Sequence, residues 1–423
     1  MFNFLLFVFV LALMVIFLIA FKKDYSCPCV LFCLGFLISS FFLLINTNNW
    51  EYVISFKTVL IISSSILVFG IGCFLGRNRK EKTQNFSLLS ETKNNSSKGK
   101  LCKCLIIAIS LMCLLVRLLD VYLTVGSLNI FSGVLGVYRG LEEESRLASL
   151  ISFCSPAISA CVIIEAVELV NAFKTKKKRI LFPLSIVLLG LVYFALSSSR
   201  IEILYTFVYI IIYLLIILKI NNKKLDSKVF IVLLILSLLL FTVFFLAGYL
   251  TGKSQNQISM FDNISLYAGS SMATFDSWIS TFVYEGKNFG ITIFRGLNNF
   301  LTRFGIQLPI SYKTDLGFRS IGEMAHTSNV YSCLAELIVD VGYIGTIVIL
   351  FLEGFFLTKF YNKAINDMRK GKRVVPYLYI YLAPLVIFSS IAERIFRTFL
   401  TISTLAFILV VYVIKLTEKK RMS

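Results

Sequence analysis

The side chains best suited to chemistry lie in one short segment of this sequence. Arg319, His326, Asn329 and Tyr331 follow one another within it, and His326 is the only histidine of the chain. A histidine titrates near neutral pH and can accept a proton from a hydroxyl group. A guanidinium group binds phosphate through two parallel hydrogen bonds. The segment therefore predicts proton transfer beside an anionic group.

Carboxylates and further arginines extend this set. Glu336 and Asp340 follow the segment one helical turn apart, which places them on the same face of a helix. Arg200 stands directly after three serines in a short turn between two apolar runs, and this unusual setting favours a functional role. The remaining candidates are Arg139, Arg146, Arg295, Arg303, Arg394 and Arg397. With one histidine, and with most cysteines in apolar runs, we expect no metal site and no cofactor.

The elements that must position these residues are membrane spans. Of the 423 residues 57% are hydrophobic and 15% are charged, whereas soluble domains carry about 25% charged residues. Apolar runs of about 20 residues, long enough to cross a bilayer as helices, occur at 2–21, 28–45, 52–75, 101–125, 149–170, 180–196, 201–220, 229–250, 342–360, 375–391 and 396–415. We therefore expect an all-α, polytopic integral membrane protein with about eleven transmembrane helices.

The spans divide the chain into three regions. Residues 1–250 hold the first eight spans and an external loop at 126–148, and residues 329–423 hold the last three spans and the C-terminus. Residues 251–328 form a long external loop whose length indicates a function. Its parts 262–284 and 290–304 have apolar residues at helical spacing, so we expect short amphipathic helices lying on the outer membrane face. The first apolar run is predicted to be a retained span and not a signal peptide.

The net charge of +19 raises the question of nucleic acid as a partner. Most lysines and arginines lie in alternate loops, at 22–23, 76–100, 171–179, 223–228, 361–374 and 415–423. By the positive-inside rule these loops are cytoplasmic, so the N-terminus is expected outside and the C-terminus inside. The basic charge is then mainly a signal of orientation, and no nucleic acid partner is expected.

The opposite, outer loops favour arginine over lysine. Their lysines are Lys253, Lys287 and Lys313, whereas most of the candidate arginines lie there. Because guanidinium remains charged when partly desolvated, this preference predicts a phosphate-bearing ligand at the outer surface. Charged groups within spans also gather at their outer ends, which predicts a polar cavity open to the outside.

Two other interpretations of these charges remain open. An arginine could instead pair with a carboxylate such as Glu202, Glu323 or Glu393. Arg117 and Asp120 are expected to be a structural pair that joins helices.

One pattern carries a family resemblance. The chain has His-x-x-Asn-x-Tyr at 326–331 and Asp-x-Gly-x-x-Gly at 340–345, leading into an apolar helix. With its many spans, its large external loop and the Ser-Arg turn at 199–200, it resembles the O-antigen and capsular repeat-unit polymerases (the Wzy family) and, more distantly, the O-antigen ligases. Ligases often have a second histidine directly before the asparagine. Ser328 occupies that position here, which favours a polymerase.

The resemblance implies a GT-C-like, metal-independent glycosyltransferase of the bacterial inner membrane, active at the periplasmic face. It would polymerise oligosaccharide repeat units linked to undecaprenyl pyrophosphate, moving the growing glycan onto a sugar hydroxyl of the acceptor unit in polysaccharide biosynthesis. The implied partners are the two lipid-linked oligosaccharides, the bilayer and a chain-length regulator protein. The alternatives are an O-antigen ligase and a flippase for lipid-linked oligosaccharides.

The resemblance also implies roles for the candidate residues. Arg200 and Arg319 would bind pyrophosphate, and His326 would act as general base or orient the acceptor. Asn329 and Tyr331 would hold sugar hydroxyls, with Glu336 or Asp340 as a reserve base. The other substrate-binding candidates are Arg139, Arg146, Arg295, Arg303, Arg394 and Arg397.

Overall fold

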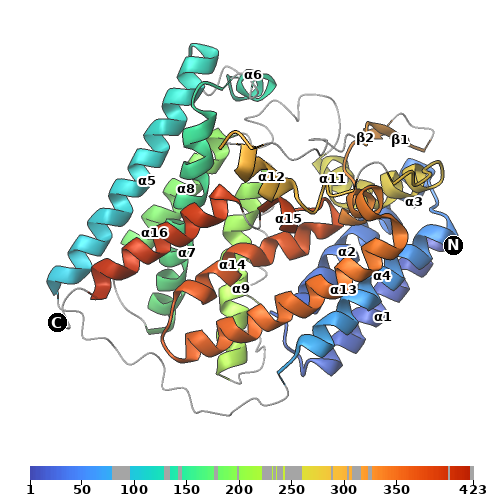
Figure 1. The fold of residues 1–423 in the computed structure, drawn as a ribbon, viewed down its shortest axis with the longest axis horizontal. Helices are drawn as coiled ribbons and strands as arrows, with labels where there is room; N and C mark the ends of the chain where they lie inside the picture. Colours follow the sequence, from blue (N-terminus) through green and yellow to red (C-terminus); the bar gives the residue numbers. More distant parts are fainter. Residues whose placement is uncertain are drawn as a thin grey trace. The chain divides into compact units, whose positions relative to one another are not determined.

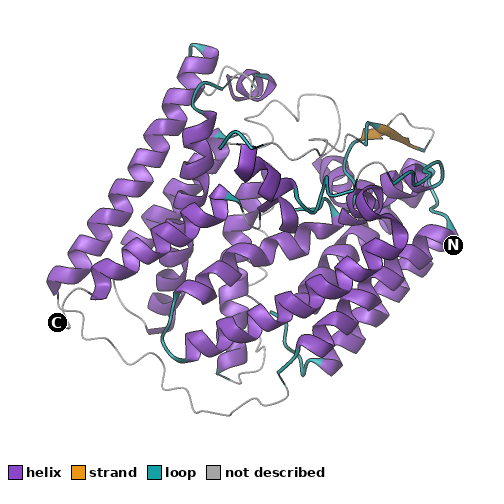
Figure 2. Ribbon diagram, viewed as in Figure 1, coloured by secondary structure: helices purple, strands orange, loops and turns teal. Residues whose placement is uncertain are grey.

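The computed structural model describes most of the chain. The described residues are 1–78, 96–127, 134–141, 145–175, 180–197, 200–221, 260–286, 289–302, 304–306, 316–322, 326–398 and 401–419, with the single positions 231, 235 and 242. These residues are almost entirely helical (Figure 2). The one sheet within them is a two-stranded antiparallel hairpin, which the sequence did not predict.

The chain folds into two compact units. Unit 1 contains residues 1–82, 259–364 and 382–401, and unit 2 contains residues 83–258, 365–381 and 402–423. The described part of the predicted external loop thus falls in unit 1. That part of the loop forms α11 (Met260–Ile279), α12 (Arg295–Thr302), β1 (Arg319–Ile321) and β2 (His326–Ser328). The other elements that lie wholly in unit 1 are α1 (Phe2–Ala20), α2 (Pro28–Ile45), α3 (Thr47–Trp50), α4 (Phe56–Gly76), η3 (Phe388–Ser390) and α15 (Ile395–Thr398).

Unit 2 consists of α5 (Ser96–Val125), α6 (Val134–Gly140), α7 (Ala148–Thr175), α8 (Leu181–Leu196), α9 (Arg200–Ile220) and α16 (Ile402–Lys419). Within it α7 packs against α5, α8, α9 and α16. Two helices belong in part to each unit, α13 (Cys333–Arg369) and α14 (Val374–Ile387). All labels follow Figure 1.

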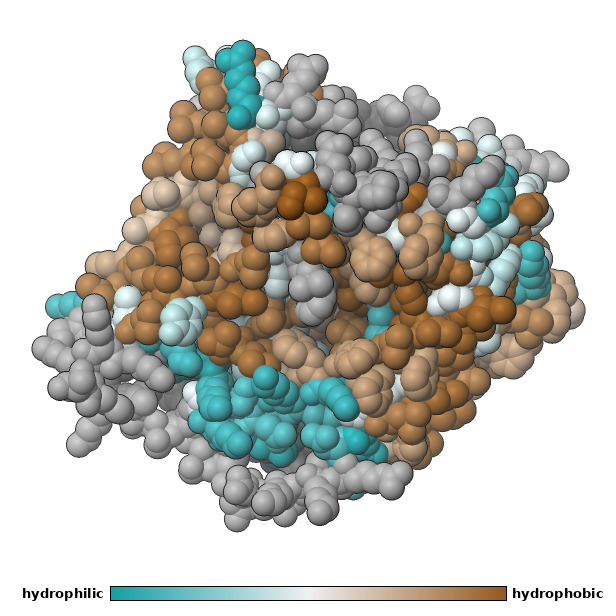
Figure 3. All heavy atoms as spheres, in the orientation of Figure 1, coloured by the Kyte–Doolittle hydropathy of each residue, from teal (hydrophilic) through white to brown (hydrophobic). Residues whose placement is uncertain are grey.

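The described helices identify a multi-pass membrane protein. Seven of them, α1, α2, α4, α5, α7, α9 and α13, are long and apolar enough to cross a membrane, and α8, α14 and α16 are shorter apolar helices. In the most apolar 18-residue stretch of α1, only 22% of the residues are buried in the protein, so most of its side chains need lipid around them. Figure 3 shows how much of the visible surface is hydrophobic. The predicted span 229–250 lies almost wholly outside the described residues, so the count of eleven stays a prediction.

At one end of unit 1 the Asn3 side chain bonds to the segment around α3, and we call this end the Asn3 end. The Asn3 amide donates to Thr47 Oγ1 at 2.9 Å and to the Tyr52 carbonyl at 2.8 Å, and its oxygen accepts the Ile54 N–H at 3.0 Å. These bonds join the start of α1 to the segment between α3 and α4. Both regions were predicted to lie at the outer ends of membrane spans.

The other end of unit 1 gathers segments predicted to be cytoplasmic. Arg77 donates to the Ala20 carbonyl at 2.8 Å, and the Tyr361 hydroxyl donates to the Asp24 carboxylate at 2.9 Å. Within unit 1 the described segments therefore alternate between two ends as the charge pattern predicted. This agreement concerns the alternation and leaves the orientation in a membrane as a prediction.

Helices α4 and α13 approach each other closely through glycines. A β-carbon at Gly72 would lie 2.1 Å from the Phe351 carbonyl oxygen, and one at Gly354 would lie 2.2 Å from the Phe69 carbonyl oxygen. Small residues that let two backbones meet are a common way to pack helices in membranes. The backbone on the facing helix cannot move aside as a side chain can.

We therefore expect the variant Gly72→Leu to lower the free energy of unfolding by about 3 kcal/mol or more. Inserting extra atoms into a packed core costs about 1–3 kcal/mol, and here the added side chain would meet backbone. The measurement is the fraction of protein that stays monodisperse in detergent after heating. Ser64→Leu is the control, because Ser64 is exposed on the same helix. Equal thermal losses for the two variants would contradict the close α4–α13 contact.

Helix α11 is more deeply buried than a helix lying on the membrane surface. Met272 and Phe275 are fully buried, and a β-carbon at Gly269 would touch the backbone of Phe42 and Leu43 in α2. The predicted range 262–284 is helical to Ile279 only. The apolar side chains of α11 thus pack within unit 1, which differs from the expected amphipathic helix on the membrane surface.

In unit 2 the predicted Arg117 and Asp120 pair is part of a buried network. Arg117 donates to the Tyr138 hydroxyl at 3.1 Å, and that hydroxyl donates to Asp120. Arg117 also donates to the Tyr193 hydroxyl at 3.3 Å, while Asp120 accepts the Ser145 hydroxyl at 2.8 Å. The tyrosine bridge joins α5 to α6 and α8, and this arrangement fits a structural role.

Candidate functional site

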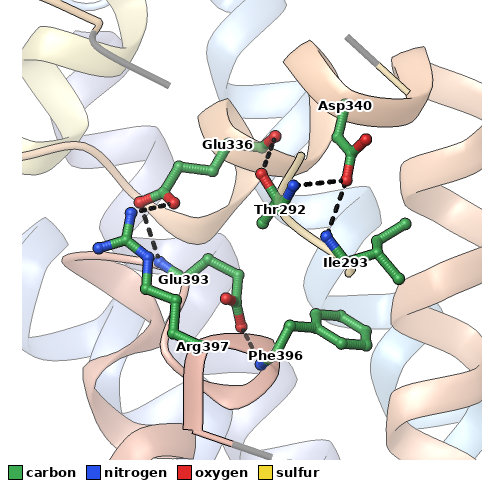
Figure 4. Close-up of polar contacts among 7 residues, drawn as sticks. All are labelled: Thr292, Ile293, Glu336, Asp340, Glu393, Phe396 and Arg397. Carbon is green, nitrogen blue, oxygen red and sulfur yellow. Dashed lines mark hydrogen bonds and ion pairs between the residues drawn. The ribbon is translucent and has the colours of Figure 1, made fainter. Parts of the chain in front are cut away.

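A group of charged side chains, with buried glutamates and half-buried arginines, lies in unit 1 near the start of α13. We call Arg295, Glu336, Glu393, Arg394 and Arg397 the Glu336 cluster. Glu336 is in the first turns of α13 and is 5% exposed. Its carboxylate forms an ion pair with Arg397 of α15 and accepts the Glu393 N–H at 3.4 Å (Figure 4). Two parts of the chain that are distant in sequence, the start of α13 and the 393–397 segment, therefore meet at Glu336.

Glu393 is a member that the sequence did not single out as a site residue. It is 2% exposed, and one of its oxygens accepts the Phe396 N–H at 2.9 Å. The other oxygen, Oε2, is buried and has no hydrogen-bond partner among the described residues. Burial raises the pKa of Glu393 to about 7. The signal for it was its place beside two arginines in a short turn between apolar runs.

Asp340 holds the segment that leads into α12. It is fully buried, and its carboxylate accepts the Thr292 N–H at 3.0 Å and the Ile293 N–H at 2.9 Å (Figure 4). The carboxylate also accepts the Gly290 N–H. The Thr292 hydroxyl also donates to the main-chain carbonyl of Glu336 at 3.2 Å. These bonds fix the 290–293 turn against α13. They give Asp340 a positioning role, since its lone pairs are occupied by backbone donors.

The turn held by Asp340 brings Arg295 close to the other charges. Arg295 is half-buried at the start of α12. Burial lowers its pKa, the Arg397 charge lowers it further, and Glu336 and Glu393 act in the opposite direction. Two guanidinium groups and two carboxyl groups thus influence one another here, and Glu393 can change its charge near neutral pH.

The arginines of the cluster have unused donors. The Nε–H groups of Arg394 and Arg397 are buried and have no hydrogen-bond partner within the described part of the chain. Buried polar groups in proteins are normally paired, so these two N–H groups are donors that a bound group could use. With three arginines and two glutamates, the cluster carries more positive than negative charge. Such a set can bind an oxyanion.

The segment with the family resemblance forms a small hairpin in unit 1. Arg319 pairs with Ser328 and Ile321 pairs with His326 in the antiparallel register. Ile321 and Ser328 are buried, and the Ser328 hydroxyl lies 2.9 Å from the Ser270 hydroxyl of α11. The backbone of His326 is described, but its side chain lies outside the described part. The hairpin is therefore anchored on α11 through one face.

Other residues of the same segment are divided between surface and interior. Asn329 is exposed and Arg319 is half-buried. Tyr331 is buried, and its hydroxyl donates to the carbonyls of Leu316 and Gly317 at 3.0 and 3.2 Å. This phenol therefore supports the chain that enters the hairpin, a different task from the sugar contact that the resemblance implies.

Three of the other predicted arginines belong to unit 2. They are Arg139 in α6, Arg146, and Arg200 at the start of α9. Arg146 is exposed, and the side chains of Arg139 and Arg200 lie outside the described part. Arg303 also lies outside the described residues. The structure thus brings together Arg295, Glu336 and Arg397 from the predicted set, with Arg394 beside Glu393.

Among the described residues, no group of three or more His, Cys, Asp or Glu side chains is arranged to hold a metal ion. The chain matches no family model, no curated protein and no solved structure.

The Glu393 carboxyl predicts a pH dependence of stability. Because its pKa is raised from 4.5 to about 7, the folded protein keeps a proton that the unfolded chain releases at lower pH. This contribution, about 3 kcal/mol at most, is present at acid pH and is lost as the pH rises from about 4.5 through 7. We expect the melting temperature of the wild type to fall over this range by more than that of Glu393→Gln.

Thermal unfolding in detergent at about pH 5 and about pH 7.5 checks this expectation. Glu51→Gln is the matched control, because Glu51 is exposed at the Asn3 end of the same unit. The assignment of the titrating group to Glu393 fails if the melting temperatures of the wild type and of Glu393→Gln fall equally between these two pH values.

Proposed function

We propose that this chain is a membrane glycosyltransferase that polymerises undecaprenyl-pyrophosphate-linked oligosaccharide repeat units at the periplasmic face of the bacterial inner membrane. The proposal includes a GT-C-like fold with eleven spans and a periplasmic Asn3 end. The observation that carries it is the Glu336 cluster, in which buried Nε–H donors of Arg394 and Arg397 have no partner among the described residues. The resemblance of the 326–345 segment, which belongs to the same unit, gives the substrate class.

The cluster suits the departure of a lipid pyrophosphate. In the proposed reaction the bond from the anomeric carbon to the pyrophosphate oxygen breaks, and the acceptor hydroxyl forms the new glycosidic bond. Negative charge then grows on the leaving pyrophosphate, where the half-buried guanidinium groups would stabilise it. Arg295, Arg394 and Arg397 are the described residues that support this role, with Arg200 and Arg319 as the arginines that the resemblance adds.

The acceptor hydroxyl must also lose a proton. His326 is the base that the resemblance implies, and Glu393 is the described carboxyl with a free oxygen and a pKa near 7. A base is most effective when its pKa is near the working pH. Glu336 is less suited, because Arg397 already pairs with its carboxylate.

Deletion of the gene followed by analysis of the surface glycan tests the proposal. We expect the deletion strain to carry a single repeat unit on the lipid acceptor. The wild-type gene, returned to this strain, should restore the polymer. Arg200→Ala, Arg319→Ala and His326→Ala should each fail to restore it. An unmodified acceptor in the deletion strain would overturn the proposal in favour of a ligase or a flippase.

A further inference from the structure

Unit 2 contains a pocket that shares no residue with the Glu336 cluster of unit 1. It is a small, partly open hollow of about 30 Å³ between α7, α9 and the turn that joins α13 to α14. Val167, Met368 and Pro376 give it apolar walls, and Tyr213, Lys372 and Arg373 give it polar ones.

The walls of this pocket are fixed by local contacts. The Tyr213 hydroxyl of α9 donates to Asn171 Oδ1 of α7 at 3.0 Å, which holds these two helices together beside the pocket. Gly371 has φ of 72°, a backbone conformation that lets the chain turn sharply between α13 and α14. The Lys372 N–H donates to the Asp367 carbonyl at 2.8 Å and closes this turn. The backbone beside Lys372 and Arg373 is therefore ordered before any ligand binds.

Positive charge predominates around the pocket. Arg369 and Lys370 adjoin Lys372 and Arg373 in the turn, whereas Glu168 and Asp367 are the acidic groups near it. The Lys372 amine lies 3.8 Å from Asp367 with a side chain that is 62% exposed, a weak ion pair that leaves the amine able to turn to another anion. Figure 3 shows a hydrophilic patch over this α13–α14 turn, bordered by hydrophobic surface.

We propose that this pocket binds the headgroup of an anionic phospholipid of the inner leaflet. The phosphate would lie against Lys372 and Arg373, and the glycerol and the first acyl carbons would lie against Met368 and Pro376. The turn is one of the loops that the charge pattern places on the cytoplasmic side. Basic pockets between transmembrane helices on that side are suited to anionic headgroups. The inference does not depend on the proposed glycan chemistry.

Native mass spectrometry of the full chain tests this site. The protein is incubated in detergent with equal amounts of phosphatidylglycerol and phosphatidylcholine, and bound lipid is counted. We expect the wild type to prefer phosphatidylglycerol by about tenfold, and Lys372→Gln/Arg373→Gln to lose most of that preference, because each cation contributes appreciably near an anionic lipid. Lys22→Gln/Lys23→Gln removes two exposed basic residues from unit 1 and should keep it.

Several outcomes would overturn the proposal. One is an equal preference for phosphatidylglycerol in the wild type and in Lys372→Gln/Arg373→Gln. Another is a loss of this preference in the Lys22→Gln/Lys23→Gln control as large as in Lys372→Gln/Arg373→Gln. The third is full displacement of the lipid by inorganic phosphate. If the double variant is not monodisperse, Lys372→Glu alone replaces it, because this side chain is largely exposed. Retained preference in Lys372→Glu would then count against the site.

Discussion

Arg397→Gln is expected to abolish the long glycan polymer while the protein still accumulates in the membrane. Arg397 pairs with Glu336 and has a buried Nε–H without a partner among the described residues. In the proposed reaction it would stabilise the leaving pyrophosphate, and loss of one such donor typically lowers the rate by about 100- to 1,000-fold. Polymer ladders from a deletion strain that carries the variant provide the measurement.

This experiment needs to separate catalysis from folding. Removing Arg397 leaves the buried Glu336 carboxylate without its partner, and such a change can cost about 3–5 kcal/mol. The double variant Glu336→Gln/Arg397→Gln removes both charges, so it should accumulate at the wild-type level and still make no long polymer. Arg77→Gln is the matched control, because Arg77 bonds to the Ala20 carbonyl at the other end of unit 1. A full-length ladder from Arg397→Gln would rule out this role for the arginine.

Asp340→Ala is expected to destabilise unit 1 strongly. The Asp340 carboxylate accepts three backbone N–H groups, from Gly290, Thr292 and Ile293, and it is fully buried. Each donor left without a partner costs about 1–3 kcal/mol, so we expect a loss of about 3 kcal/mol or more. The readout is the melting temperature in detergent, which should fall by several degrees.

The matched control for this prediction is Asp367→Ala. Asp367 pairs at 3.8 Å with Lys372, whose side chain is largely exposed, and such surface pairs contribute about 0–1 kcal/mol. If Asp340→Ala melts at the same temperature as Asp367→Ala, then the 290–293 turn does not depend on the carboxylate. Arg295 would in that case have to be positioned by other contacts.

The sequence predicted those elements that depend on apolar length. The run at 28–45 corresponds to α2, and the runs at 201–220 and 180–196 correspond closely to α9 and α8. A stretch of apolar residues long enough to cross a bilayer has few alternatives to a helix, because its backbone must be paired internally. The alternation of charged loops within unit 1 follows from the same composition.

The hairpin and the membership of the cluster could not be predicted in this way. Strands as short as β1 and β2 carry no periodic signal, and their pairing depends on a turn at Gly322, where a β-carbon would collide with the Trp50 carbonyl. Glu336 and Arg397 meet only after α13 and α15 have packed. The sequence supplied the candidate charges, but long-range packing selects which of them share a site.

Helix α13 has a consequence for the thickness of the membrane that suits this protein. Gly342 has φ of 69° and interrupts the helix, so that a straight portion runs from Tyr343 to Arg369. At about 1.5 Å per residue this portion rises about 40 Å, close to the thickness of a bilayer with its headgroups, about 40–45 Å. Its two ends therefore match the two polar boundaries of one membrane. A bilayer several ångströms thinner would force this helix to tilt, and lipid chain length should then alter activity even where no side chain is changed.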